Sequence, residues 1–394
     1  MDNFVFESPT KIIFGQGTCD HLEYELRSMG AKSLLVLYGS DRVRKNGLLD
    51  SLEIAAERAG AKVELFGSIE ANPHVSTAIR AAEVARKVDA DFLLGVGGGS
   101  VLDVAKAAAV CAADPDINLT DLLMGRASVN RCLPLGAVLT IAGSGSEASA
   151  SAVLTIDDSG MKRSFGSDLI RPRFAILDPT YTYSLPQINM VAGACDILMH
   201  TMERYFSPTE DTELIDSMAE GLMRTVINLV PRCIEHPCDY NARANLMWAG
   251  TLSHNGLLGT GRVEDWSCHK LEHELSGLFN VVHGAGLCAV WGSWASYVQP
   301  KHPERFAQFA RNVMGISASS EDEQGKRGIE ALIAFFRSIG MPTTIVGLEE
   351  VELTEDVIDQ MARNCLAASE TIGGLEPLGY DDIVAIYRKA GEMS

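Results

Sequence analysis

Residues 91–106 read DFLLGVGGGSVLDVAK, an apolar run followed by three glycines and then by a pattern typical of a helix. The apolar run predicts a buried strand over residues 91–96, and the glycines predict a turn that leads into the helix. Glycine leaves backbone N–H groups accessible, and a helix N-terminus adds positive potential. We therefore expect the turn Gly97–Ser100 to bind the pyrophosphate of a dinucleotide.

This turn matches neither of the two best-known phosphate-binding patterns. It has no third glycine three residues after a Gly-x-Gly pair, and no Gly-Lys-Ser or Gly-Lys-Thr follows it. The alternative interpretation is an ordinary structural turn.

The surrounding segments predict a parallel sheet. Predicted strands at 33–38, 62–66 and 135–139 alternate with helical patterns at 48–59 and 75–87. Continuous apolar strands that alternate with helices are typical of a parallel sheet covered on both faces, with ligands at the carboxyl ends of the strands. The loop at 140–147, rich in hydroxyls and glycine, follows one such strand, and it is either a second cofactor contact or an ordinary polar turn.

The two ends of this α/β region have their own patterns. Residues 4–14 predict two short β segments interrupted by Pro9, and Thr18 predicts the N-cap of a helix that ends near Gly30. Beyond Pro186 the pattern becomes almost wholly amphipathic and helical. We expect a dinucleotide-binding α/β domain over 1–184 and an all-α domain over 185–394, with the ligand in the cleft between them.

Two helical segments of the second domain carry pairs of metal-binding side chains. Asp196 and His200 lie four residues apart, as do His269 and His273, so each pair shares one face of a helix. His283 follows the second pair closely enough for the chain to turn back toward it. Three imidazoles and one carboxylate suit Zn²⁺ or Fe²⁺ rather than Ca²⁺ or Mg²⁺. Each pair alone is also compatible with an ordinary helix-surface pair.

Spacing leaves the role of one histidine open. Either His269 or His273 completes the ligand set, and the other is a proton relay or binds the substrate oxygen. A dinucleotide beside a redox-inert divalent metal predicts hydride transfer at an alcohol carbon.

Composition excludes several classes of partner. A formal net charge of −19 argues against nucleic acid or an anionic membrane and favours a small soluble substrate. The N-terminus has no signal-peptide pattern and no apolar run is long enough to span a bilayer, so we expect a cytoplasmic protein. Its nine cysteines form no disulfide framework and are expected to be reduced.

Taken as a set, these motifs resemble the iron-containing (group III) alcohol dehydrogenases, closest to their butanol dehydrogenase-like branch. The resemblance extends over nearly the whole chain and rests on Gly97–Ser100 with Asp103 and Lys106, the loop 144–147, Asp196 with His200, and His269, His273 and His283. It implies a Rossmann-like α/β domain followed by a helical domain, an architecture like that of dehydroquinate synthase. It also implies one Fe²⁺ or Zn²⁺, NADP or NAD, a small primary alcohol or aldehyde as substrate, and a homodimer that pairs N-terminal strands.

Site residues follow from the resemblance motif by motif. It implies metal ligands at Asp196, His200, His269 and His283, which leaves His273 as the nearby catalytic group that binds no metal. It implies cofactor contacts at Gly39, Ser40, Asn72, Gly97, Gly98, Gly99, Ser100, Asp103, Thr140, Ser144, Ser146 and Lys162.

Cofactor preference depends on the residues after the second strand. NAD-preferring members tend to carry an acid there, whereas this chain has Ser40, which leaves room for a 2′-phosphate that Arg42 or Arg44 could bind. Asp41, which lies beside Ser40, is an acid and argues for NAD, but Ser40 and the arginines favour NADP, and we expect NADP.

Three alternatives remain at this point. A glycerol dehydrogenase or a lyase like dehydroquinate synthase would share the fold but gather fewer histidines around the metal. A nucleotide- or metal-binding protein without activity is the alternative from another class.

Overall fold

Six strands form one parallel sheet in the computed structural model, which describes residues 1–392. Their order across the sheet is β1-β8-β5-β4-β2-β3, and all five neighbouring pairs are parallel. The strands are β1 Lys11–Phe14, β2 Ser33–Tyr38, β3 Lys62–Phe66, β4 Phe92–Gly97, β5 Leu135–Leu139 and β8 Phe174–Leu177. The predicted parallel sheet is therefore confirmed.

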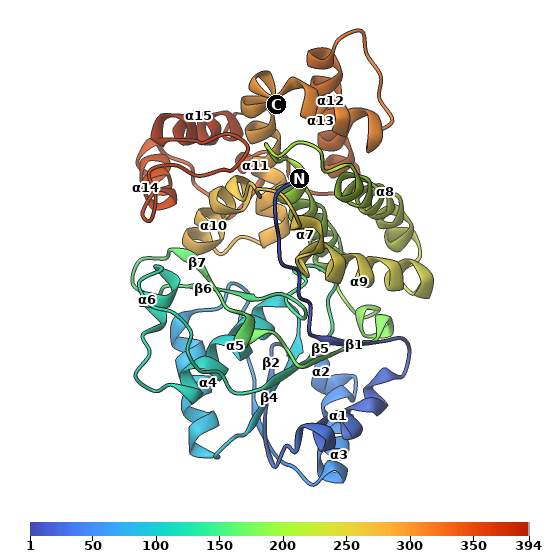
Figure 1. Cartoon of the computed structure of the whole chain (residues 1–394), viewed down its shortest axis with the longest axis vertical. Helices are drawn as coiled ribbons and strands as arrows, with labels where there is room; N and C mark the ends of the chain where they lie inside the picture. The colour runs from blue at the N-terminus through green and yellow to red at the C-terminus, as the bar shows by residue number, and fades with distance from the viewer. Residues whose placement is uncertain (393–394) are drawn as a thin grey trace. The chain divides into compact units, whose positions relative to one another are not determined.

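Alternate residues of the central strands enter different cores because successive side chains of a strand point to opposite faces. In β2, Leu35 and Leu37 belong to the cluster that includes α4 (Val75–Lys87) and α5 (Gly99–Ala113). Leu34 and Val36 belong to the other cluster, with α1 (Leu22–Met29) and α3 (Leu48–Ala59). Figure 1 shows these two helix pairs on opposite sides of the sheet.

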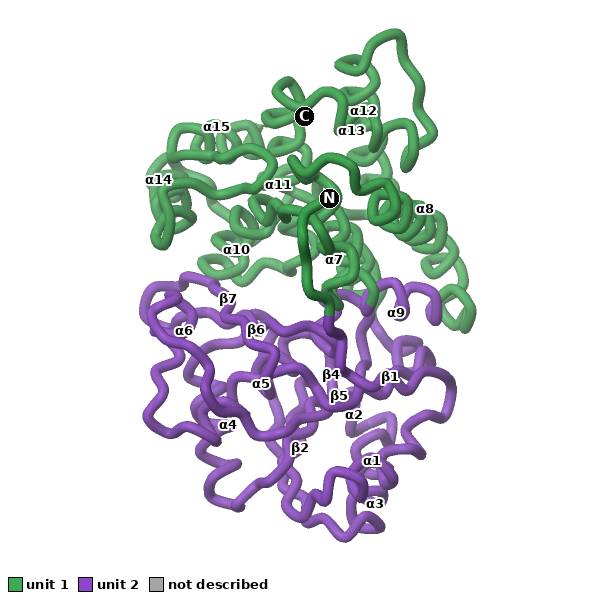
Figure 2. Tube along the Cα trace, viewed as in Figure 1, with its two compact units in different colours: residues 1–6, 186–242, 252–394 green, residues 7–185, 243–251 purple. Residues whose placement is uncertain are grey.

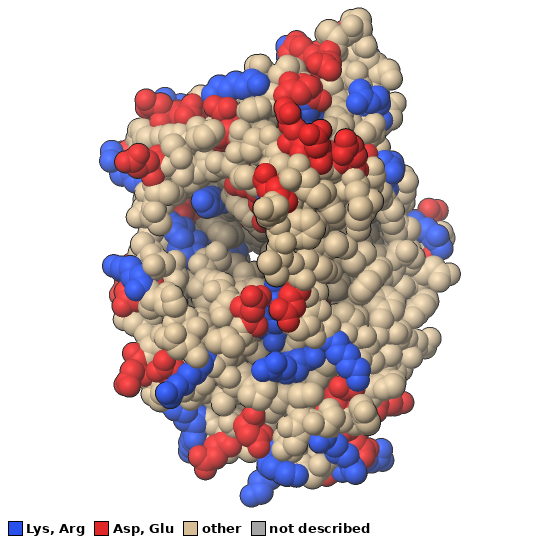
Figure 3. All heavy atoms as spheres, viewed as in Figure 1, with Lys and Arg blue, Asp and Glu red and all other residues tan. Residues whose placement is uncertain are grey.

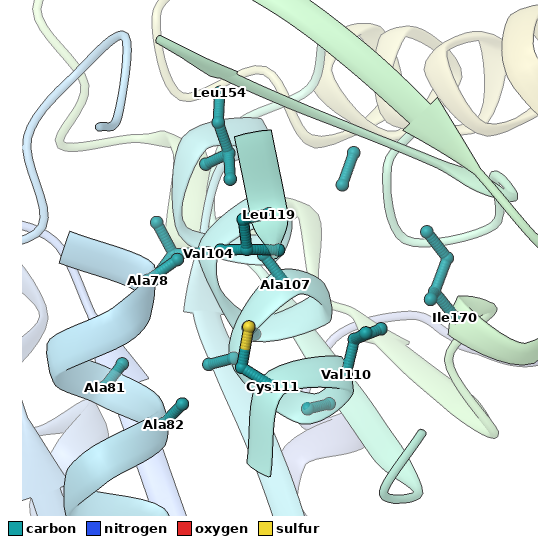
Figure 4. Packing of buried hydrophobic residues seen from close by; sticks show 14 of the residues in the cluster. Ala78, Ala81, Ala82, Val104, Ala107, Val110, Cys111, Leu119, Leu154 and Ile170 are labelled. Carbon is teal, nitrogen blue, oxygen red and sulfur yellow. The ribbon is translucent and has the colours of Figure 1, made fainter. Parts of the chain in front are cut away.

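Alanines bring α4 and α5 close together. Ala78, Ala81 and Ala82 of α4 face Val104 and Ala107 of α5 in one buried cluster (Figure 4). Small side chains allow a close approach of the two helices, and this packing holds the first turn of α5 at the end of β4. The glycine turn is thereby fixed in place.

Three local expectations were wrong or incomplete. Residues 4–8 form no strand, and only Lys11–Phe14 pairs with the sheet. Thr18 begins a short 3-10 helix instead of capping α1, and its hydroxyl donates to the Gly15 carbonyl, 2.8 Å away. An antiparallel pair, β6 Ser151–Thr155 with β7 Lys162–Gly166, was not predicted.

The described residues divide into two units (Figure 2). Unit 2 holds Glu7–Leu185, which contains the sheet, together with Arg243–Thr251. Unit 1 holds Met1–Phe6, Pro186–Ala242 and the described residues from Leu252 onward. The division expected between residues 184 and 185 stays a prediction, and the two units differ from it by these two short segments.

Unit 1 is built of helices, and from residue 186 to 392 the structure records no strand. Its helices are α7 Gln187–Tyr205, α8 Glu213–Glu235, α10 Ser267–Phe279, α11 His283–Val298, α12 Pro303–Asn312, α13 Glu321–Ser338, α14 Glu355–Cys365 and α15 Tyr380–Ala390, while α9 Tyr240–His254 contributes residues to both units. Within the described part of the chain, no helix is long and apolar enough to cross a membrane.

Candidate metal centre

Three helices of unit 1 present the predicted ligands. Asp196 and His200 lie one turn apart on α7, and His269 lies in the first turn of α10. Asn280 ends α10 in the left-handed conformation, with φ 56°, and the chain turns so that His283 begins α11. The turn therefore returns His283 toward the helix that carries His269.

One carboxylate oxygen lies next to all three imidazoles. Oδ1 of Asp196 is 3.5 Å from Nδ1 of His200, 3.7 Å from Nε2 of His269 and 3.6 Å from Nε2 of His283. Ligand atoms about 2.1 Å from a tetrahedral ion are about 3.4 Å apart, so this spacing fits one divalent cation.

Three of these four atoms are buried without hydrogen-bond partners. Oδ1 of Asp196, Nδ1 of His200 and Nε2 of His269 are all in this condition. Buried polar atoms are almost always hydrogen-bonded, so a convergent group that is not points to a bound ion. Nitrogen ligands with one carboxylate suit Fe²⁺ or Zn²⁺.

Two further carboxylates orient the imidazoles. Oε1 of Glu203 is 2.7 Å from Nδ1 of His269 and also accepts from the His269 backbone N–H at 2.8 Å. Oε2 of Glu272 makes a short contact with Nδ1 of His283. A carboxylate on the far ring nitrogen fixes the tautomer and directs the other nitrogen toward the metal.

Glu203 and Glu272 were missed in the sequence. The available signal was their helical spacing, since Glu203 lies three residues after His200 and Glu272 three residues after His269. That spacing places each glutamate on the ligand-bearing side of its helix, but it does not identify which imidazole the glutamate contacts. Glu203 contacts a histidine on a different helix.

The pKa values of His200 and His269 shift in opposite directions. Burial, with the nearby His254 and His269, holds the pKa of His200 well below its usual value. Burial also opposes the charge on His269, but Asp196 and Glu203 outweigh it and raise the pKa of His269 to about 9. A proton on His269 must therefore leave before that nitrogen can bind a metal.

His273 lies beside the centre but outside the group around Asp196. Its ring centroid is 6.3 Å from that of His269 and 5.7 Å from that of His283. It is half-buried and groups instead with Glu272 and His283. His254, which was not predicted, stacks edge-on against His200 with ring centroids 4.1 Å apart.

In unit 2 the glycine turn lies where the sequence predicts it. Gly98 is the N-cap of α5, and Gly99 is its first residue. A Cβ atom on Gly99 would lie 2.4 Å from Oγ of Ser144, so the turn and the loop at 140–147 are in contact. Ser100 follows in the first turn of α5.

Buried hydrogen bonds hold the second loop against α5. Oγ of Ser146 donates to Asp103 at 2.8 Å, and Nζ of Lys106 donates to Ser146, to Ser149 and to the Ser151 carbonyl. Burial lowers the pKa of Lys106 to about 8. This network joins two of the predicted cofactor contacts, Asp103 and Ser146, to the buried ammonium group of Lys106.

Two more predicted residues are paired with each other. Nζ of Lys162 donates to Oδ1 of Asn72 at 2.8 Å. Asn72 is in the left-handed region at φ 49°, where asparagine is tolerated better than most residues.

The two candidate arginines after β2 differ in their contacts and in their exposure. Gly39 is close to the Ile69 carbonyl, and Ser40 is exposed. Arg42 donates to the Tyr181 carbonyl at 2.9 Å and to Thr140 at 3.1 Å. Arg44 is exposed, and its guanidinium donates to the Tyr38 hydroxyl at 2.7 Å. Arg42 is thus engaged within unit 2, whereas Arg44 is accessible.

Comparison with known proteins identifies the family on both halves of the chain. A family model described as iron-containing alcohol dehydrogenase matches residues 9–179, and the model of the C-terminal region of Fe-containing alcohol dehydrogenases matches residues 190–391. The chain is 35% identical to NADH-dependent butanol dehydrogenase A of Clostridium acetobutylicum, over 99% of this chain and 100% of that relative.

Two further relatives extend the comparison. The chain is 36% identical to the NADPH-dependent aldehyde reductase YqhD of Escherichia coli, over 87% of this chain and 88% of that one. The crystal structure of NADH-dependent butanol dehydrogenase A from Thermotoga maritima superposes with a TM-score of 0.95 at 34% identity, covering 100% of this chain and 99% of that one.

Proposed function

The chain belongs to the iron-containing alcohol dehydrogenase family and is a metal-dependent, NAD(P)-linked alcohol dehydrogenase or aldehyde reductase, and on that premise we propose which residues carry the reaction. Asp196, His200, His269 and His283 hold one Fe²⁺ or Zn²⁺. The observation that carries this assignment is the oxygen of Asp196 within 3.5–3.7 Å of three imidazole nitrogens.

A metal held by these four residues would polarise the substrate oxygen as a Lewis acid, and a bound nicotinamide would accept or donate the hydride. Glu203 and Glu272 each accept the N–H of a ligand imidazole, which keeps the opposite ring nitrogen free of its proton. His273, half-buried at the edge of the centre, exchanges the alcohol proton with solvent.

For the cofactor we propose the residues expected from the sequence. The turn Gly97–Ser100 binds the pyrophosphate at the start of α5, and Asp103 and Ser146 hold the adjoining loop. The Asn72–Lys162 pair, together with Thr140 and Ser144, contacts the remainder of the dinucleotide.

NADP is the proposed cofactor in preference to NAD. Ser40 is small and exposed, which leaves space for a 2′-phosphate, and Arg44 offers the accessible guanidinium. Replacing Arg44 with alanine should lower kcat/KM for NADPH and leave that for NADH nearly unchanged. An equal effect on both cofactors would exclude a contact between Arg44 and the 2′-phosphate.

The substrate is proposed to be a small primary alcohol or its aldehyde, since the named relatives are butanol dehydrogenases and an aldehyde reductase. We further propose a cytoplasmic homodimer. Strand β1 ends the sheet, so one of its edges has no strand partner among residues 1–392 and is available for pairing with a second copy. Sedimentation would test the dimer.

The test of function is butyraldehyde reduction followed by cofactor absorbance. Protein stripped of metal should be inactive, and either Fe²⁺ or Zn²⁺ should restore turnover, with NADPH and NADH compared in parallel. No turnover with either metal and either cofactor would contradict the proposal.

A further inference from the structure

Trp266 has a backbone conformation that a bulky residue rarely adopts. It is the N-cap of α10 and has φ 64° and ψ 6°, in the left-handed region. That conformation costs free energy for any residue with a Cβ atom, and most for bulky ones. Such a conformation persists only where surrounding contacts hold it in place, and it often marks a functional site.

The contacts that hold Trp266 come from two charged side chains. Its indole Nε1 donates to Oε2 of Glu264 at 2.5 Å, and the guanidinium carbon of Arg204 lies 4.7 Å from its ring centroid. Nε of Arg204 is 3.2 Å from Oε1 of Glu264, so the three side chains form a closed triangle. Arg204 is buried, which strengthens a cation–π contact.

This triangle connects the two helices that carry proposed metal ligands. Arg204 is a residue of α7, and its Nη1 donates to the carbonyl of His200 in the same helix at 2.8 Å. Trp266 is the N-cap of α10 and lies three residues before His269, so it connects the triangle to α10. The triangle therefore fixes the first turn of α10 relative to the ligand turn of α7.

The indole also contacts the ligand rings themselves. Its centroid is 5.1 Å from that of His269 and 5.9 Å from that of His200, and both contacts are edge-on. It lies 5.6 Å from the ring of His254, which stacks on His200. No other described tryptophan has a ring contact with a histidine.

We propose that Trp266, held by Arg204 and Glu264, is a positioning residue that sets the relative orientation of the His200 and His269 imidazoles and thereby the affinity for the metal. The inference rests on the proposed metal site. The strained backbone of Trp266 is retained because a side chain is needed at that point, where glycine would otherwise be preferred.

The decisive variant is Trp266→Gly, studied by Co²⁺ titration of metal-stripped protein. Glycine adopts the left-handed conformation without strain, which offsets part of the contact energy lost with the indole, so the metal-free variant should still fold, as circular dichroism would show. Loss of a group that orients ligands should weaken Co²⁺ binding about 10–100-fold and change its visible absorption spectrum. Trp266→Phe, which keeps a ring but loses the bond to Glu264, should show a smaller loss.

Two further variants make the test specific. Trp248→Phe, in unit 2, is the matched control and should bind Co²⁺ like the parent. Gly259→Ala disturbs the triangle without changing any of its three residues, because a Cβ atom there would lie 1.9 Å from Oε1 of Glu264 and displace the carboxylate. It should weaken Co²⁺ binding while Trp266 and Arg204 are unchanged.

Co²⁺ affinity within about twofold of the parent, with the same spectrum, in both Trp266→Gly and Gly259→Ala would overturn the positioning role. Absence of Co²⁺ binding by the parent protein, or its persistence in His269→Ala, would instead overturn the metal site itself. The two failures are thereby distinguishable.

Discussion

At the scale of single residues, the imidazoles of His200, His269 and His283 surround Oδ1 of Asp196. His273 lies outside the group around this oxygen, so it differs from His269 in its expected role. Nε2 of His269 is buried and 3.7 Å from that oxygen, whereas His273 is half-buried and groups with Glu272 and His283 instead of Asp196. His269→Ala should therefore lose bound metal. His273→Ala should keep its metal and lose about 10²–10⁴-fold in rate, the usual contribution of a proton-transfer group.

Metal analysis by mass spectrometry alongside steady-state kinetics checks both variants. His302→Ala is a suitable control, because His302 is hydrogen-bonded to Glu376 and has no ring contact with the centre. The reverse pattern, with metal lost from His273→Ala and kept in His269→Ala, would exchange the two assignments.

The raised pKa of His269 predicts a pH dependence of the metal-free protein. Its pKa is about 9 in the fold and about 6.5 in an unfolded chain, so the folded state holds its proton more tightly. The resulting stabilisation is complete below about pH 6.5 and is lost as pH rises toward 9. Metal affinity should change in the opposite direction and increase over the same range, because the competing proton leaves.

Denaturant unfolding of metal-stripped protein at pH 6.5, 7.5 and 9 would measure the first effect, and Zn²⁺ titration the second. Glu203→Gln removes a carboxylate that raises the pKa of His269, so it should flatten both dependences. Unfolding free energies that rise over this range in the parent would contradict the prediction.

At the scale of elements, the start of α5 and the loop after β5 are in contact and together form the proposed cofactor site. A Cβ atom on Gly99 would lie 2.4 Å from Oγ and 2.9 Å from Cβ of Ser144, so Gly99→Ala must displace the loop. We expect weaker binding of the dinucleotide with the metal content unchanged. Calorimetric titration with NADPH would measure it.

Gly221→Ala is the matched control. It lies inside α8, where the nearest atom to an added Cβ is Arg224 Nη2 at 3.8 Å. Alanine there should stabilise the protein by about 0.5–1 kcal/mol and leave cofactor binding unchanged. Equal dinucleotide affinity in Gly99→Ala and the parent would exclude a tight fit between the turn and the loop.

The same elements show what local sequence patterns can predict. The central strands β2 and β5 are buried apolar runs, and both match their predicted ranges. The edge strand β3 also matches its predicted range, although it contains Lys62 and Glu64 and is largely exposed or half-buried. Strand β7, Lys162–Gly166, is polar and pairs only with β6, so its apolar pattern was too weak to predict it. Residues 4–8 have the opposite character, with strand-like composition but no strand to pair with.

In the candidate centre, the helical spacing identified which helices carry ligands but not how their rings are turned. The proximity of Glu203 to His269, and of Trp266 to His200, depends on how α7 and α10 pack, which no single segment encodes. The engagement of Arg42 with Tyr181 and Thr140 likewise joins residues more than ninety positions apart.

At the scale of the whole molecule, acidic side chains dominate the charge. The formal net charge is −19, and acidic groups gather over the helices of unit 1 on the face seen in Figure 3. Such a surface repels polyanions, which agrees with a small uncharged substrate.

We expect removal of the metal to destabilise unit 1 more than unit 2. All four proposed ligands lie in unit 1, so the ion stabilises the folded form of that unit, by about 2.7 kcal/mol when free metal is 100 times its Kd. Hydrogen exchange of metal-stripped protein should show lost protection in α7, α10 and α11, with β2 and β4 of unit 2 unchanged. Because local opening draws on the contacts nearest the missing ligand, equal loss in β2 and β4 would mean that both units open as a single cooperative block.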